Sequence, residues 1–173
     1  MGLITRLFKT PSGGLVGIGS EGSVTLPDSQ VRVRGGGATN YGSSGTTTRR
    51  FFAVESTFGS AITYTASATN GDSWTINSSG IYHITYSDKS SVQLRPFGIS
   101  VNGVTTDNIA VQPTAARILF GLIPASNVPD CVSGSFRLST GDIIRAQSDG
   151  NADFTTSSTD AGVYVTITQI VKL

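Results

Sequence analysis

The sequence predicts an all-β sandwich, and three observations support this fold class. Charged residues make up only 13% of the 173 residues, and the polar remainder is largely Ser, Thr and Asn, which favour strands and turns over helices. Short segments alternate apolar and polar residues, as strands with one buried face do. Turns rich in Gly and Asn separate these segments. Many short strands divided by such turns are typical of a β-sandwich.

The chain from Phe51 onward consists of a succession of strand-like segments. Alternation is clearest in GIYHITYS and GVYVTITQI, and turn signals such as Thr140-Gly141-Asp142 interrupt the pattern. PTAARILFGLIP has a composition that a helix could also have, but its position between two prolines and among strands favours a strand. The expected strands are residues 50–56, 60–66, 73–77, 80–87, 97–102, 116–123, 132–138, 143–148 and 162–170.

Residues 1–50 are expected to form an N-terminal arm, and residues 51–173 a sandwich head. Eleven of the 21 glycines lie in the first 50 residues, so this stretch can bury little apolar area per residue. Six basic and two acidic residues give the arm a charge of +4, whereas the head carries −3. This charge either docks the arm on an acidic protein surface or merely keeps it soluble. Residues 15–19, 23–26 and 30–34 alternate like short strands, and residues 3–8 could form one helical turn.

Composition also excludes several classes of protein. A single cysteine, Cys131, rules out an internal disulfide framework, and we expect it to be a buried thiol. No apolar run approaches the roughly 18 to 20 residues of a membrane-spanning helix, and the N-terminus lacks a secretory signal pattern. The basic residues have no interleaved aromatics, so no nucleic-acid platform is expected. We therefore expect a leaderless chain without membrane insertion or nucleic-acid binding.

The sequence offers few groups for catalysis. His83 is the only histidine and lies in a predicted strand, where a half-exposed or hydrogen-bonded imidazole is the usual arrangement. No local signature of a nucleophile accompanies His83 or Cys131. Asp149, Asn151 and Asp153 alternate as in a calcium loop, but the terminal Glu of that motif is missing. We expect no catalytic residues, no metal site and no cofactor, and hence a protein that is not an enzyme.

Four segments, in order, resemble a known signature. They are GDSWTINSSGIYHITYS (71–87), FGISVNG (97–103), SGSFRLSTGDIIRAQSDG (133–150) and GVYVTITQI (162–170). This ordered set resembles the complement-component globular head family as it occurs in bacteriophage structural proteins, a family with the jelly roll of the tumour necrosis factor superfamily. The resemblance covers roughly residues 51–173 and implies a jelly-roll β-sandwich. It further implies a homotrimer with the C-terminal strand near the threefold axis.

Candidate interface residues follow from the alternation and from this resemblance. Tyr82 and Tyr86 share one face of their strand and suit either an intersheet or an intersubunit role. The expected trimer interface comprises Tyr82, Tyr86, Tyr164, Val165 and Ile167. The expected docking residues of the arm are Leu3, Ile4, Leu7, Phe8, Arg32 and Arg34.

The leading hypothesis is a virion structural protein: a trimeric capsid decoration or cement protein, on the capsid exterior. Its arm would contact the major capsid protein, other virion proteins or neighbouring trimers. The alternative is the knob of a tail fibre, spike or needle that binds a host receptor or glycan. No heptad repeat or collagen-like tract is present to build a shaft for such a knob. A secreted ligand would be expected to carry a leader, and a glycan hydrolase would need two carboxylates across a cleft. In either virion role the chain would be synthesised in the host cytoplasm.

Overall fold

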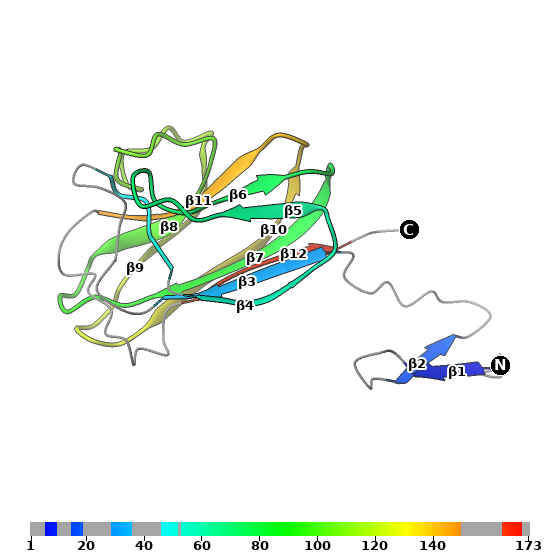
Figure 1. The fold of residues 1–173 in the computed structure, drawn as a ribbon. Coiled ribbons are helices and arrows are strands. Elements are labelled where there is room, and N and C mark those ends of the chain that lie inside the picture. The colour runs from blue at the N-terminus through cyan, green and yellow to red at the C-terminus, as the bar shows by residue number, and fades with distance from the viewer. Residues whose placement is uncertain are drawn as a thin grey trace.

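The computed structural model is all-β, as expected (Figure 1). The structure describes residues 6–9, 15–18, 29–35, 46–51, 53–149 and 164–170. Side chains are described for residues 29–35, 46–51, 53–149 and for Ile167. Within these ranges every regular element is a strand, and none contains a helix that could cross a membrane.

Ten strands form two five-stranded antiparallel sheets that face each other. The first sheet has the order β10 (Asp130–Leu138), β7 (Gly80–Asp88), β12 (Tyr164–Ile170), β3 (Ser29–Arg34) and β4 (Ala53–Phe58). The second has the order β5 (Ile62–Thr65), β6 (Ser73–Ile76), β11 (Ile143–Ser148), β8 (Pro96–Val101) and β9 (Arg117–Leu122). Apart from these sheets, β1 (Arg6–Lys9) and β2 (Leu15–Ile18) pair with each other.

The nine strands expected between residues 50 and 170 are all present, with ends that differ by no more than three residues. The segment that was ambiguous between helix and strand forms β9. The Gly141-Asp142 turn is also present. Gly141 has φ +93°, a region that favours glycine, and the Asp142 carboxylate accepts a hydrogen bond from the Ser139 N–H at 2.8 Å.

The expected boundary between arm and head at residue 50 is wrong. β3 comes from the predicted arm, yet it lies inside the first sheet between β12 and β4. Val31 and Val33 are fully buried there, because the alternation of QVRVR gives the strand one apolar face. Thr48 forms a β-bridge with Gln147, so residues 46–50 also belong to the sandwich.

The expected helical turn at residues 3–8 is also wrong where it can be compared. Residues 6–9 form β1, which pairs with β2 in antiparallel register. A cross-strand partner satisfies backbone groups that a single isolated helical turn would leave free. Residues 3–5 and the expected piece at 23–26 lie outside the described residues.

Large apolar side chains fill the space between the two sheets. Tyr86 meets Phe97 edge-on across the core, with ring centroids 5.4 Å apart. Trp74 is fully buried and contacts Phe51 with centroids 5.6 Å apart. The remaining fully buried apolar residues of the core cluster include Ile76, Tyr82, Ile84, Ile99, Ile123, Ile144 and Ile167.

The loop of residues 102–116 packs on the second sheet. Ile109 is fully buried and lies against Gly98 of β8. Gln147 of β11 donates from Nε2 to the carbonyl oxygens of Val104 at 2.8 Å and Asp107 at 3.2 Å. A buried amide with its partners satisfied fixes the loop to the sheet.

The sandwich has two distinct ends. Ser29, where β3 begins, is in register with Gln169 near the end of β12. Asp88, where β7 ends, is in register with Asp130 at the start of β10. The chain thus enters β3 and leaves β12 at one end, and the loops of residues 89–95 and 123–129 lie at the other (Figure 1).

Candidate subunit interface

One side of the sandwich, along β9 and β10, has no covering strand among the described residues. β9 pairs only with β8, and β10 only with β7, so each is the edge of its sheet. Gly121 allows the two sheets to approach here. A Cβ atom at this position would lie 2.7 Å from Val132 Cγ1 and 2.7 Å from the Phe97 ring. The two edges therefore form one continuous open side.

Apolar side chains follow this open side. Phe120 and Leu122 of β9 are 44% and 45% exposed, and Phe120 is exposed although Arg117 lies over its ring at 5.2 Å. Edge strands with exposed apolar residues readily bind further polypeptide. We call the following residues the open-side patch: Phe120 and Leu122, which are exposed on the outer face of β9, and Ile118, Leu119, Val132 and Phe136, which are partly buried against the core at the same edge.

The open-side patch continues into two loops at the end of the sandwich where β7 ends. Val92, Leu94 and Val128, which we call the tip residues, are 40%, 65% and 46% exposed. Leu94 adopts φ 59°, a left-handed conformation that is rare and strained for leucine. Hydrogen bonds hold this arrangement: the Leu94 N–H donates to Ile123 O at 2.6 Å, and the Asn127 N–H to Ser90 O at 2.7 Å.

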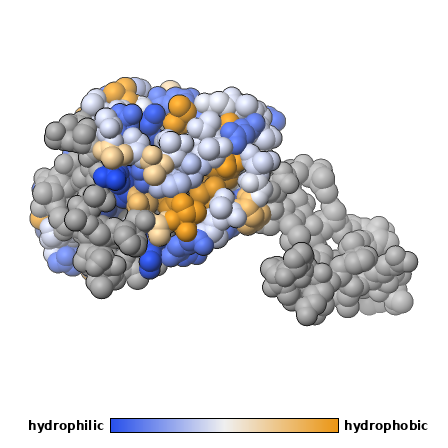
Figure 2. All heavy atoms as spheres, viewed as in Figure 1, coloured by the Kyte–Doolittle hydropathy of each residue, from blue (hydrophilic) through white to orange (hydrophobic). Residues whose placement is uncertain are grey.

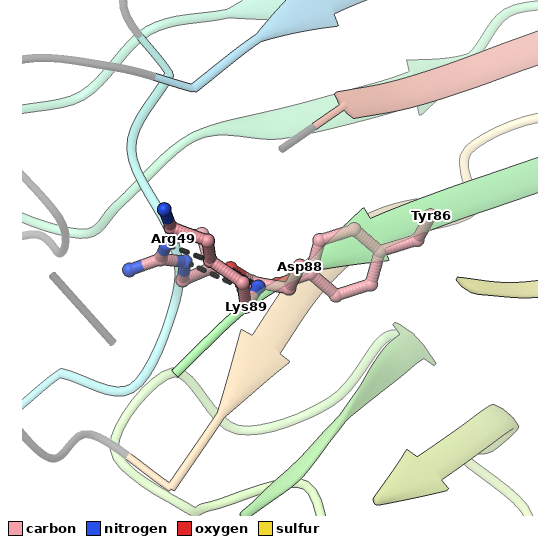
Figure 3. Close-up of polar contacts among 4 residues, drawn as sticks. All are labelled: Arg49, Tyr86, Asp88 and Lys89. Atoms are coloured by element: carbon pink, nitrogen blue, oxygen red, sulfur yellow. Dashed lines mark hydrogen bonds and ion pairs between the residues drawn. The ribbon is translucent and has the colours of Figure 1, made fainter. Parts of the chain in front are cut away.

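A buried ion pair fixes the start of the tip (Figure 3). Asp88 is fully buried, and its Oδ2 lies 2.9 Å from Arg49 Nε. Arg49 Nη2 donates to Oδ1 at 3.0 Å, the Lys89 N–H donates to the same oxygen at 2.8 Å, and the Tyr86 hydroxyl donates to Oδ2. Burial raises the pKa of the Asp88 carboxyl, and the Arg49 charge opposes this rise. The pair ties residues 46–51 to the last residue of β7.

Three of the five expected interface residues are in the core instead. Tyr82, Tyr86 and Ile167 have no exposed surface in the single chain, so they have none to offer a second subunit. For the two tyrosines, the intersheet role is the one that the structure shows. Tyr164 and Val165 belong to β12, opposite Arg34 and Val33 of β3, and their side chains lie outside the described residues.

The expected docking residues of the arm lie in different parts of the structure. Arg32 and Arg34 are on β3, within the sheet rather than in an arm. Their Nε atoms lie 2.9 Å and 3.4 Å from the carboxylate of Glu55 on β4. Leu7 and Phe8 belong to β1, where they pair with Gly17 and Val16, and Leu3 and Ile4 lie outside the described residues.

The residues considered for chemistry lie apart. Cys131 is an exposed free thiol, contrary to the expected buried one, because it occupies an outward position on the edge strand β10. His83 is half-buried, with Nδ1 3.1 Å from Ser135 Oγ, as expected for a hydrogen-bonded imidazole. Register places Cys131 opposite Ser87 and His83 opposite Ser135, so the thiol and imidazole are separated along the strands. Among the described residues, no group of three or more His, Cys, Asp or Glu side chains could hold a metal ion.

The tip residues and the Arg49–Asp88 pair were not predicted from the sequence. Val92, Leu94 and Val128 are apolar residues in segments otherwise rich in Ser, Gln, Asn and Pro. Apolar residues outside any alternating pattern were a usable signal for an exposed surface. No local pattern could have linked Arg49 to Asp88, because 39 residues separate them in the chain.

Comparison with solved structures identifies the fold. Three crystal structures of murine APRIL, determined at pH 8.5, 5.0 and 8.0, superpose with TM-scores of 0.56, 0.54 and 0.52. Their sequence identities are 16%, 15% and 16%, and each match covers 82% of this chain and 98% of the other. The sandwich is a tumour-necrosis-factor-like jelly roll. No protein-family model and no curated protein sequence matches the chain.

Proposed function

We propose that this protein is a homotrimeric structural protein without enzymatic activity, and that the open-side patch forms its subunit contact. The observation that carries the proposal is the pair of exposed apolar residues, Phe120 and Leu122, on an unpaired edge of a tumour-necrosis-factor-like jelly roll. The resemblance to trimeric family members supports the stoichiometry. Burying each half-exposed side chain would stabilise the contact by about 1 kcal/mol.

A closed ring of three subunits needs a second, different surface to receive this patch. The outward face of β10 suits that role, because Ser133 and Ser135 are small and exposed and allow a neighbour to approach closely. Cys131 on the same face is also small. In this arrangement the patch of each subunit lies on the first sheet of the next.

Charge introduced at the patch tests the contact. We expect the wild-type chain to elute as a trimer in size-exclusion chromatography with light scattering, and the double variant Phe120→Asp/Leu122→Asp to elute as a monomer, because burying unpaired carboxylates is costly. Val111→Asp is the matched control, since Val111 is 67% exposed on the 102–116 loop. A double variant that is folded by circular dichroism and still trimeric would remove this patch from the interface.

The more specific role that we propose is in a virion, as a capsid decoration or cement protein whose N-terminal arm docks on other virion proteins. The β1–β2 hairpin supports an arm of this kind, because it pairs with none of the sandwich strands in the structure. Quantitative mass spectrometry of purified particles tests this role. Many copies per particle are expected, and absence of the chain from particles would refute it.

The alternative role is a tail fibre, spike or needle knob that binds a host receptor or glycan. The tip residues favour this role, because they lie at the end of the sandwich opposite to the start of β3. A knob anchored by its N-terminal arm would present this distal surface to a host. Few copies per particle, together with loss of cell binding in Leu94→Ser, would favour the knob over decoration.

A further inference from the structure

We propose that the β1–β2 hairpin of one copy adds to the free edge of β4 in a neighbouring copy and links copies of the chain together. This inference rests on the proposed function, because it names the partner of the N-terminal arm. It concerns the side of the sandwich opposite to the open-side patch. Apolar residues at the edge of β4, the pairing of the hairpin strands only with each other, and the length of the connection to β3 support it.

The edge of β4 exposes apolar residues on both of its faces. β4 pairs only with β3, and Val54 and Phe58 are 46% and 45% exposed. Val54 is opposite the buried Val33 and hence faces the core, whereas Phe58 is opposite Gln30 on the outward face. Both are exposed because each has a neighbouring strand on one side only. A partner on one face would cover one of them, but an added strand covers both.

The apolar surface on this side is visible in the space-filling view. Figure 2, drawn from the same direction as Figure 1, shows an apolar band between β5 and the β3–β4 pair. Val54 of β4 is an exposed apolar residue on this side, whereas Ile62 of β5 is only 5% exposed.

The length of the free edge matches the hairpin. A bulge between Arg32 and Val33 places Glu55 outside the regular ladder, where it binds two arginines. The regular part of β4 beyond the bulge runs from Ser56 to Phe58. β1 and β2 have four residues each. A strand of four residues can pair along Ser56–Phe58 and extend with its last residue toward the bulge, so that it lies beside Phe58 and reaches Val54.

The hairpin needs a partner. Two-stranded hairpins are marginally stable in water, and three strands or an apolar neighbour are usually required. The sequences RLFK and LVGI are rich in apolar residues, yet β1 and β2 pair only with each other among the described strands. The hairpin of the same chain leaves its own β4 edge free, so we assign the edge to the hairpin of a second copy.

The connection allows the hairpin to lie away from its own sandwich. Residues 19–28 join β2 to β3, and ten extended residues span at most about 33–36 Å. The connection joins the sandwich at Ser29, whose hydroxyl donates to the Phe58 carbonyl at 3.0 Å. The hairpin is thus tethered at the end of the β4 edge. Addition of a strand to a neighbour's sheet is an established mode of polypeptide recognition.

Disulfide trapping tests the inference in the full chain. In a Cys131→Ser background, one protein carries Val54→Cys and a second carries either Val16→Cys or Phe8→Cys, so that a disulfide between the two engineered sites can form only between chains. After mixing under mild oxidation, we expect the Val54–hairpin disulfide to form about tenfold faster than the same reaction with Val111→Cys, because docking raises the local thiol concentration. Disulfides that form no faster with Val54→Cys than with Val111→Cys, for both Val16→Cys and Phe8→Cys, would overturn the inference.

Two further measurements keep this result separate from the proposed function. A protein with both Val16→Cys and Val54→Cys that closes a disulfide within one chain, while the mixed pair does not, would replace the second copy with the chain's own hairpin and overturn the inference. Light scattering on the same samples reports the trimer independently. Unlinked chains that are trimeric would leave the trimer proposal standing, whereas linked chains that never form trimers would contradict the trimer and support the hairpin.

Discussion

At the scale of single residues, the Arg49–Asp88 pair is an ion pair buried within the sandwich. Both side chains are essentially unexposed, at 1% and 0%, and the carboxylate accepts from several donors. Two buried charges that pair with each other contribute modestly to the free energy of unfolding. Removal of one of them is costly, because the other is then buried without a partner. The pair therefore acts mainly to fix how residues 46–51 join the end of β7.

The variant Asp88→Asn should lower the free energy of unfolding by about 3–5 kcal/mol at neutral pH, because Arg49 keeps its charge without a carboxylate. Urea unfolding measures this change. Glu55→Gln is the control, since it breaks ion pairs with Arg32 and Arg34 that are 45% and 40% exposed. Exposed pairs of this kind contribute at most about 1 kcal/mol. Equal losses in the two variants would show that burial does not set the strength of the pair.

Tyr64 gives the sandwich a dependence on alkaline pH. Burial raises the pKa of its hydroxyl well above the usual range, and the hydrogen bond that it donates to Asp72 at 2.5 Å raises it further. The unfolded chain releases this proton near pH ~10, and the folded chain does not. The contribution to stability is thus complete below pH ~10 and is lost as the pH rises above it. Above pH ~10, the free energy of unfolding of Tyr64→Phe should fall less steeply with pH than that of the wild type, by the slope that corresponds to about one proton. An unchanged slope would contradict this assignment.

At the scale of elements, Gly98 determines how β8 pairs with β9. A Cβ atom at this position would lie 2.1 Å from the Leu119 carbonyl oxygen of β9 and 3.0 Å from Ile109. The carbonyl belongs to the backbone and cannot rotate away, so the strands would have to separate. This geometry also explains why the 102–116 loop can pack directly on the sheet.

Gly98→Ala should therefore destabilise the fold by about 1–3 kcal/mol and accelerate amide hydrogen exchange in β9. Gly141→Ala is the matched control. Its added Cβ would meet no atom within 4 Å beyond the adjacent residues, so any loss of stability arises from the backbone strain at φ +93°. We expect the control to lose stability without faster exchange in β9. Unchanged exchange in Gly98→Ala would show that β9 does not depend on this close approach.

The strands were predictable from the sequence, but their assembly was not. Alternation and turn signals identified the strands between residues 50 and 170, because both are local properties of the sequence. Whether β3 joins the head depends on partners far away in the chain, since it pairs with β12 across more than a hundred residues. For the same reason, alternation placed Tyr82 and Tyr86 on one face without showing that this face is the core.

At the scale of the whole molecule, the sandwich has a closed core and two open sides. The open-side patch lies along β9 and β10, and the free edge of β4 lies on the opposite side of the first sheet. The tip residues and the start of β3 lie at opposite ends. We propose that one side closes the trimer and that the other receives a hairpin from a neighbouring copy, with the tip residues directed away from the anchored end.

Native mass spectrometry of the intact chain at micromolar concentration decides whether the protein is a homotrimer. We expect a dominant species at three times the 17.9 kDa mass of the chain. The double variant Phe120→Asp/Leu122→Asp should be a monomer, because trimer formation would bury unpaired carboxylates. A folded wild-type chain found only at 17.9 kDa at this concentration would show that the protein is a monomer and refute the homotrimer.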